Sequence, residues 1–161
     1  MEIYARDVMT RNFETIRDDA PIKEAVYRIL HGNIRETGHK TVSLIVIDEF
    51  GRLEGVLSLF DILYHFRPDF LNYGLDSIET WVGRLKPLLE RFSDLTVEQV
   101  MSSPVMTVSP DDHLMVIIDK LVKKKLRRLP VVDADRVVGV VYLFDAYYHL
   151  FHAWCEKEHG R

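Results

Sequence analysis

The sequence predicts an α+β fold in which two copies of one β-α-β-β-α unit are joined by an inserted helical segment. Two observations lead to this prediction. Several short motifs occur twice in the same order, and within each copy short apolar runs alternate with apolar residues at helical spacing. Each copy is too short to bury a large core alone, so we expect the two copies to pack together and bury a shared face.

The repeat is defined by two pairs of matching segments. Residues 8–10 (Val-Met-Thr) match residues 100–102 (Val-Met-Ser) at an offset of 92, whereas residues 55–61 match residues 139–145 at an offset of 84. The first copy therefore has eight more residues than the second between these two matching segments. Seven of these residues fall within 31–40, where two glycines and mixed charges predict a loop.

Each copy contains the same elements in the same order. A short extended piece leads into a helix, which begins near Pro21 in the first copy and after Pro110 in the second. Two strands joined by a tight turn follow, and a second helix begins at Leu59 or Leu143. The predicted strands are residues 42–47 and 53–58 in the first copy, and residues 129–132 and 137–142 in the second.

The segment between the copies has no counterpart in either of them. Its apolar residues form one helical stripe that we expect to dock on the module or on a partner subunit, and Pro87 is expected to kink or split the helix. Asp76 and Glu79 have the spacing of a capping box. The stripe consists of Ile78, Trp81, Val82, Leu85, Leu89 and Phe92. The predicted boundaries are 1–66 for the first repeat, 67–93 for the inserted segment, 94–155 for the second repeat and 156–161 for a C-terminal tail.

The composition is that of an ordinary globular protein, with 47% hydrophobic and 29% charged residues and a net charge of −4. The single cysteine, Cys155, excludes a disulfide framework or a four-cysteine zinc site within one chain and is typical of a reducing compartment. No uncharged run approaches the ~18 residues of a spanning helix, and the N-terminus lacks the pattern of a secretion signal. We therefore expect a cytoplasmic protein that does not enter a membrane.

The β-α-β-β-α repeat, the Val-Met-Thr/Ser openings and the Gly-hydrophobic-hydrophobic-x-x-x-Asp endings resemble the cystathionine beta-synthase (CBS) domain family over residues 5–65 and 95–152. Two such copies would form one Bateman module. The resemblance implies that the copies associate through their sheets about a pseudo-twofold axis and leave two clefts between them. It also implies an adenosyl ligand such as AMP, ADP, ATP or S-adenosylmethionine, and a regulatory role without catalysis or a required cofactor.

The candidate ribose ligands are Asp61 and Asp145, on the first turn of the second helix of each copy. A carboxylate there can accept hydrogen bonds from both vicinal hydroxyls, and the family motif gives its aspartate this role. Ser58 matches the hydroxyl position of the motif and is expected to contact ribose or phosphate, whereas Tyr142 stands there in the second copy. Both aspartates also suit a structural role, because a negative charge is favourable at a helix N-terminus.

The densest basic cluster of the chain ends at Arg127 and Arg128. By the family resemblance, this pair would bind the phosphate of a ligand whose ribose is held by the other copy, at Asp61. The corresponding positions of the first copy hold Val42 and Ser43. We therefore expect the clefts to differ, with phosphorylated adenosine favoured in the Asp61 cleft and the other cleft empty, weaker or suited to an uncharged tail.

Three further residues are assigned to the pocket walls. Thr15 and Thr107 close the first extended piece of each copy, where family members often line the pocket. Pro130 is expected to form a stiff pocket wall or to protect a strand edge. The lysines within 120–125 are expected to form a solvated helix face.

Other functions stay open. A ligand-free scaffold or dimerisation module is favoured by Tyr142 and by the missing basic pair of the first copy. Nucleic-acid binding through residues 120–128 would require steep salt dependence, and the acidic net charge disfavours it. A metal site at His149, His152 and Cys155 would span ~9 Å of helix, which is long for one ion. Common enzyme motifs are missing from the sequence, so we expect no catalytic activity. We also expect a homodimer that transmits ligand occupancy to a protein that the sequence does not identify.

Overall fold

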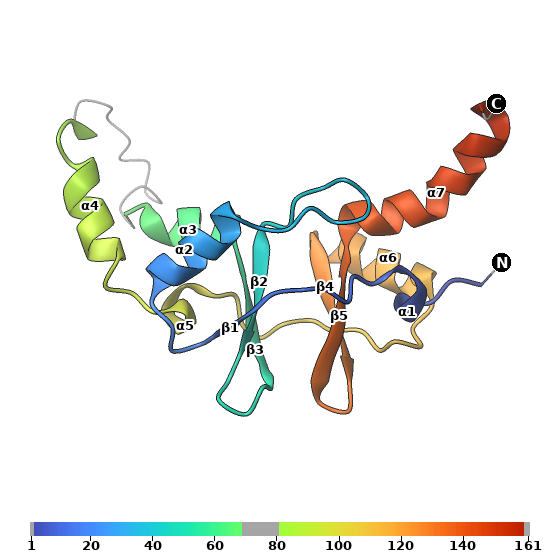
Figure 1. Ribbon diagram of the computed structural model, residues 1–161, viewed down its shortest axis with the longest axis horizontal. Helices are drawn as coiled ribbons and strands as arrows, with labels where there is room; N and C mark the ends of the chain where they lie inside the picture. Colours follow the sequence, from blue (N-terminus) through green and yellow to red (C-terminus); the bar gives the residue numbers. More distant parts are fainter. Residues whose placement is uncertain (1, 69–80, 160–161) are drawn as a thin grey trace.

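The computed structural model describes residues 2–68 and 81–159. Each repeat forms a small sheet with helices on its outer side, and the two sheets face each other at the centre of the molecule (Figure 1). The predicted α+β fold of two packed repeats is confirmed. The first half of the chain forms α1 (Ala5–Val8), β1 (Thr15–Arg17), α2 (Ile22–Leu30), β2 (Ser43–Ile47), β3 (Leu53–Ser58) and α3 (Leu59–Phe66). The second half forms α4 (Leu85–Phe92), α5 (Val97–Val100), α6 (Leu114–Lys123), β4 (Arg128–Asp133), β5 (Arg136–Tyr142) and α7 (Leu143–His159).

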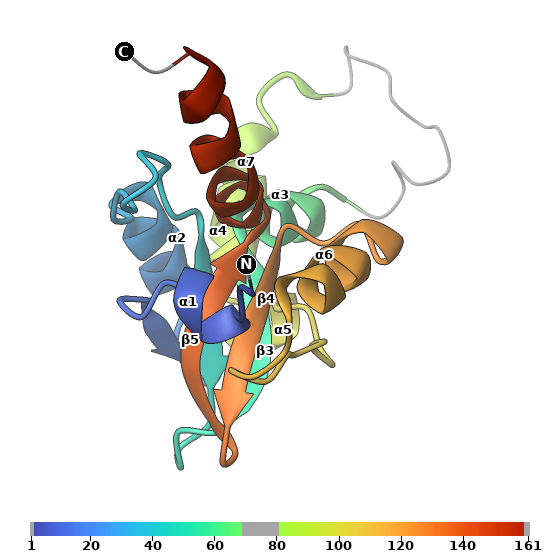
Figure 2. The same ribbon diagram turned by 90° about the vertical axis from the view of Figure 1, so that its right-hand side faces the viewer.

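The two sheets share one hairpin topology. β2 pairs antiparallel with β3, β4 pairs antiparallel with β5, and β1 adds a parallel strand to β2. In the second repeat, the equivalent of β1 is a single parallel bridge between Val108 and Val131. Both hairpin turns lie at the same end of the molecule (Figures 1 and 2), where the Arg136 guanidinium donates to the Phe50 carbonyl oxygen at 2.6 Å.

Three apolar clusters hold the fold together. One lies between the first sheet and its helices, and a second lies between the other sheet and its helices. The third joins the two sheets through Ile45, Val56, Val140 and Tyr142. Because burial of apolar surface is the dominant favourable contribution to folding, this third cluster makes the two repeats one folded unit.

The short opening helix of each repeat packs into the core of the other repeat. Ala5 and Val8 of α1 are buried in the second core, where α1 contacts β5 and α7. Val97 and Val100 of α5 are buried in the first core, against α2, α3 and β3. The boundaries at residues 66 and 94 therefore do not separate the cores, since each core contains side chains from both halves of the chain.

Two glycines of the repeat motif make room for this exchange. A Cβ atom at Gly139 would lie 2.5 Å from the sulfur of Met9, and one at Gly55 would lie 2.6 Å from the sulfur of Met101. The backbone beside each methionine is hydrogen-bonded to the strand that carries the glycine. The methionine and the glycine that mark each repeat in the sequence are thus contact partners across the two repeats.

The inserted segment contains α4, which covers the second half of the predicted stripe. The helix begins at Leu85, so Pro87 lies in its first turn, where a missing backbone donor costs no hydrogen bond, and it does not interrupt a longer helix. Phe92 is buried and meets the Phe66 ring edge-on at 5.5 Å, whereas Leu89 is exposed. α4 therefore docks through its C-terminal end. The predicted capping-box residues Asp76 and Glu79, and Ile78 of the stripe, lie outside the described residues.

The last helix, α7, spans 17 residues and extends away from the body of the molecule (Figure 1). Tyr147 and Trp154 on α7 are both 59% exposed. Among the described helices, none combines the length and the apolar character that a membrane crossing requires.

Candidate functional site

A cleft between the repeats brings together the four residues that are predicted to hold a phosphorylated ligand. This Asp61 cleft has a volume of about 490 Å³ and contains Ser58 and Asp61 from one repeat, with Arg127 and Arg128 from the other. Ser58 ends β3 and Asp61 lies on the first turn of α3, whereas Arg128 begins β4 and Arg127 directly precedes it. Neither repeat can therefore form the cleft alone. The walls also include Val56, Ser102, Val105, Met106 and Lys125.

The Asp61 carboxylate is held by three hydrogen bonds. Its Oδ2 accepts from the backbone N–H and the hydroxyl of Ser58 at 2.9 and 3.0 Å, and its Oδ1 accepts from the Ser102 hydroxyl at 2.7 Å. The pairing of Ser58 and Asp61 forms a capping box at the start of α3. Asp61 thus has the structural role of a helix cap. Since its two oxygens offer about four acceptor positions, it also retains capacity for a ligand hydroxyl.

Arg128 contributes a positive charge with an unused donor. Its side chain is half-buried, and its Nε atom has no hydrogen-bond partner among the described residues. Burial lowers the pKa of the Arg128 guanidinium, while nearby Tyr142 and Asp61 oppose that shift. A guanidinium stays protonated in proteins. The cleft is therefore lined by a partly desolvated cation, which is suited to an anionic group.

At the pseudo-symmetric cleft, the Asp145 carboxylate is paired with a side chain of the first repeat. Arg35 Nε donates to Asp145 Oδ2 at 2.9 Å, and Arg35 Nη2 donates to Oδ1 at 3.4 Å. The guanidinium also covers the Tyr142 ring, with Cζ 3.9 Å from the ring centroid. The Thr37 hydroxyl adds a hydrogen bond to Asp145 Oδ1 at 2.6 Å. A cavity of about 440 Å³ remains beside these residues.

The loop that carries Arg35 is the insertion that lengthens the first repeat. It leaves the end of α2 and crosses to the start of α7 in the other repeat (Figure 1). We predicted that the two clefts differ because the first copy lacks the basic pair and because Tyr142 replaces a small hydroxyl residue. The structure adds a buried cation over the Tyr142 ring. Burial raises the pKa of the Tyr142 hydroxyl, although Thr41, Arg35 and Arg128 act in the opposite direction.

The three predicted wall residues are not among those that line either cleft. Thr15 borders a separate hollow beside α2, and its carbonyl oxygen accepts from Arg28 at 2.7 Å. The Thr107 carbonyl oxygen accepts from Lys120 of α6 at 3.3 Å, and Pro130 is buried within β4. These positions belong to contacts inside one repeat. For Thr15 and Thr107, a position at the end of an extended piece suits a contact within one repeat as well as a place in a cleft wall.

Three contributors to the clefts were not predicted: Ser102, Arg35 and Thr37. Ser102 belongs to the repeated Val-Met-Ser opening, but its contact with Asp61 depends on the exchange of the opening segments, which the sequence does not reveal. Arg35 and Thr37 lie among the seven extra residues of the first repeat. The length of that insertion was the available signal, and it does not show where the loop goes.

His152 of α7 contacts two side chains of its own helix. The His152 ring stacks on Tyr148 with centroids 4.6 Å apart, and its Nδ1 lies 3.9 Å from the Glu156 carboxylate. Within residues 2–68 and 81–159, no three His, Cys, Asp or Glu side chains are grouped so that they could hold a metal ion. The structure therefore gives the arrangement of His149, His152 and Cys155 no support as a metal site.

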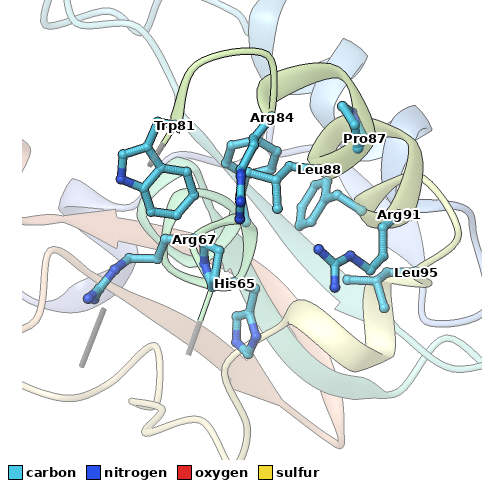
Figure 3. Close-up of a pocket in the computed structure, with 11 residues that line it drawn as sticks. His65, Arg67, Trp81, Arg84, Pro87, Leu88, Arg91 and Leu95 are labelled. Carbon is cyan, nitrogen blue, oxygen red and sulfur yellow. The ribbon is translucent and has the colours of Figure 1, made fainter. Parts of the chain in front are cut away.

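A further hollow of about 610 Å³ lies between the end of α3 and α4 (Figure 3). Its described lining includes Arg67, Arg84 and Arg91 and contains no acidic residue. The hollow shares no residue with either inter-repeat cleft.

Comparison with protein families identifies two matching segments. The family model described as CBS domain matches residues 5–67 and 97–152. A search of curated proteins finds no match. Among solved structures, the CBS domain of a CBS domain containing membrane protein from Sphaerobacter thermophilus is 26% identical, with a TM-score of 0.68 over 91% of this chain and 86% of that chain.

Two other similar structures contain ligands. The crystal structure of CBSX2 in complex with AMP is 24% identical, with a TM-score of 0.67 over 92% of this chain and 97% of that chain. The CBS domain pair of protein MJ0100, in complex with 5′-methylthioadenosine and S-adenosyl-L-methionine, is 23% identical, with a TM-score of 0.67 over 96% of this chain and 99% of that chain. At these identities the likeness concerns the fold.

Proposed function

The chain belongs to the CBS domain family, with two CBS domains in tandem, and on this premise we propose that it is a non-catalytic regulatory module that binds an adenine nucleotide in the Asp61 cleft. Binding of adenosyl ligands by CBS domain pairs in general agrees with this role. The proposal includes a cytoplasmic homodimer that transmits ligand occupancy to a regulated protein. The nucleotide would act as a signal, so no cofactor is required.

The observation that carries the proposal is that Asp61 of one repeat and the partly buried Arg128 of the other line one cavity. A nucleotide presents two vicinal hydroxyls on its ribose and an anionic phosphate at its other end. A carboxylate suits the hydroxyl donors, and a guanidinium suits the phosphate. The cavity volume of about 490 Å³ is also within the usual range for small-molecule sites.

The nature of the basic residues favours a ligand with a phosphate. The AMP bound to CBSX2 has one, whereas the two ligands named for MJ0100 have none. A ligand without a phosphate would offer no anionic group to the Arg127 and Arg128 side chains that line the cleft. We therefore rank AMP, ADP and ATP above S-adenosylmethionine for this chain.

Thermal unfolding with each of these four ligands tests the proposal. A nucleotide at ~100 times its Kd should add about 2.7 kcal/mol of stability, enough to raise the Tm by a few degrees. The Asp61→Ala variant should lose this increase, because the ribose hydroxyls lose their acceptor. Loss of the helix cap will lower the Tm of that variant without ligand, so the ligand-induced shift is compared. Asp94→Ala, at an exposed position, should keep the full shift.

The Arg128→Gln variant tests the phosphate contact separately. Loss of charge-assisted hydrogen bonds, at about 1.5–3 kcal/mol, should weaken AMP binding roughly 10- to 150-fold while leaving adenosine binding unchanged. Isothermal titration calorimetry with AMP and adenosine measures both affinities. Lys124→Gln removes a charge from an exposed position that does not line the cleft, and it should bind AMP as the wild type does. Equal weakening for AMP and adenosine would contradict a phosphate role for Arg128.

A ligand-free scaffold is the second candidate, and two observations favour it. The Asp61 carboxylate already accepts three hydrogen bonds within the chain, and Asp145 is paired with Arg35. The exposed apolar side chains of α3, Phe60 and Leu63, would then belong to a subunit interface. If none of the four ligands raises the Tm of protein purified free of nucleotide, this candidate is favoured.

A further inference from the structure

We propose that Arg35 is an intramolecular ligand of the Asp145 cleft and limits the chain to one adenosyl ligand. This inference rests on the proposed function, because it concerns the second of the two inter-repeat clefts. It makes Arg35 the residue that sets the binding stoichiometry.

The Arg35 guanidinium uses the groups that a ligand would need. Asp145 lies on the first turn of α7, as Asp61 does on α3, and its carboxylate is the candidate acceptor for ribose hydroxyls. Arg35 donates two hydrogen bonds to that carboxylate, and its Cζ lies over the Tyr142 ring, 3.9 Å from the centroid. A planar group with adjacent donors thus already occupies the carboxylate and the aromatic face.

The contact is enclosed. The Arg35 and Asp145 side chains are 8% and 3% exposed, so water competes little with their ion pair. An incoming ribose would have to displace a cation from a buried carboxylate. In the Asp61 cleft, the corresponding partners are the hydroxyls of Ser58 and Ser102, which carry no charge.

The loop presents Arg35 in a defined shape. The Arg35 N–H donates to the His39 carbonyl oxygen at 2.8 Å, and the Gly38 N–H donates back to the Arg35 carbonyl oxygen at 2.8 Å. Gly38 has a φ of +89°, which a residue with a side chain rarely adopts. The His39 ring lies 3.8 Å from the Phe144 ring on α7. The loop is therefore folded on itself and anchored to the second repeat at a second point.

The second cleft also lacks a basic pair like that of the first. The positions equivalent to Arg127 and Arg128 are Val42 and Ser43. The cavity beside Asp145 is instead lined by Arg6 and Arg11 of the first repeat, and the Arg6 guanidinium is already paired with Asp111. The pairing of Asp145 with Arg35 is therefore the feature that restricts nucleotide binding to the Asp61 cleft.

Binding stoichiometry measured by isothermal titration calorimetry, with AMP and S-adenosylmethionine as probes, tests this proposal. The wild type should bind one ligand per chain, and Arg35→Ala should bind two. The double variant Asp61→Ala/Arg35→Ala should bind one, in the Asp145 cleft. Arg17→Ala serves as the control, because Arg17 is exposed, pairs with Asp19 and lies outside both clefts; it should bind one.

Arg35→Lys is a second variant for the case in which Arg35→Ala does not fold. It keeps a positive charge beside Asp145 but lacks the planar guanidinium group. It should show a second, weaker site. Two sites in the wild type, or no additional site in either folded Arg35 variant, would overturn the proposal. The proposed function can fail independently: a wild type that binds neither probe, with an Arg35→Ala variant that binds one, would support the role of Arg35 and refute binding in the Asp61 cleft.

Discussion

Replacement of Asp145 by alanine is expected to lower the free energy of unfolding by about 3–5 kcal/mol, because it leaves a buried guanidinium without its counter-charge. Arg35 is 8% exposed and its Nε and Nη2 donate to the Asp145 carboxylate, so water cannot readily replace the lost partner. If the loop instead leaves the cleft, Tyr142 and the start of α7 lose the surface that covers them. Both responses destabilise the folded protein.

Urea unfolding of the wild type and of Asp145→Ala measures this loss. Asp119→Ala is the matched control, because Asp119 forms an exposed ion pair with Lys123, and such pairs contribute about 0–1 kcal/mol. A double-mutant cycle with Arg35→Ala isolates the pair itself. A loss below about 1 kcal/mol for Asp145→Ala would mean that the loop detaches freely and that the ion pair adds little to stability.

Replacement of Leu57 by alanine is expected to cost about 2–5 kcal/mol, through lost apolar burial and the cavity that it leaves. Leu57 is fully buried in β3 within the first core, directly before Ser58. That core also holds Val97 and Val100 of α5, so it cannot loosen without affecting the second half of the chain. We therefore expect one unfolding transition, shifted as a whole.

Fluorescence and circular dichroism followed together during urea unfolding measure both the size of the loss and the number of transitions. Leu63→Ala removes the same atoms from a side chain that is 59% exposed, and it should change the free energy of unfolding far less. Two separate transitions in Leu57→Ala would contradict the coupling of the two cores. A loss equal to that of Leu63→Ala would contradict the burial of Leu57.

Much of the fold could be predicted because its signals are local. Apolar periodicity and turn residues locate the helices and strands within each repeat, and the two copies confirm each other. The side chains of the Asp61 cleft could also be predicted, since Asp61 and the Arg127–Arg128 pair each occupy a fixed position in the repeated motif. Their assignment to one cleft came from the family resemblance, and their role in binding stays a prediction.

The features that could not be predicted depend on contacts between distant parts of the chain. Arg35 and Asp145 are 110 residues apart, and no local pattern links an arginine in a loop to a carboxylate in the other repeat. The exchange of α1 and α5 is equally non-local. The structure shows that Gly139 leaves room for the Met9 side chain of the other repeat, but the sequence alone does not link these two residues. Thr15 and Thr107 show the other limit, because their equivalent positions in the two copies suit contacts within each repeat as well as a cleft wall. Their place in a cleft wall stays a prediction.

The exchange of the opening helices has a consequence for how the chain could assemble. A fragment ending at residue 68 would contain α1 without β5 and α7, on which α1 packs, and a fragment starting at residue 81 would contain α5 without α2, α3 and β3. Each fragment thus contains a helix that packs in the core of the other fragment. We therefore expect the two fragments to associate without a covalent link. Between two intact chains, the same interlocking offers a route to domain swapping, in which α1 of one molecule fills the second repeat of its neighbour.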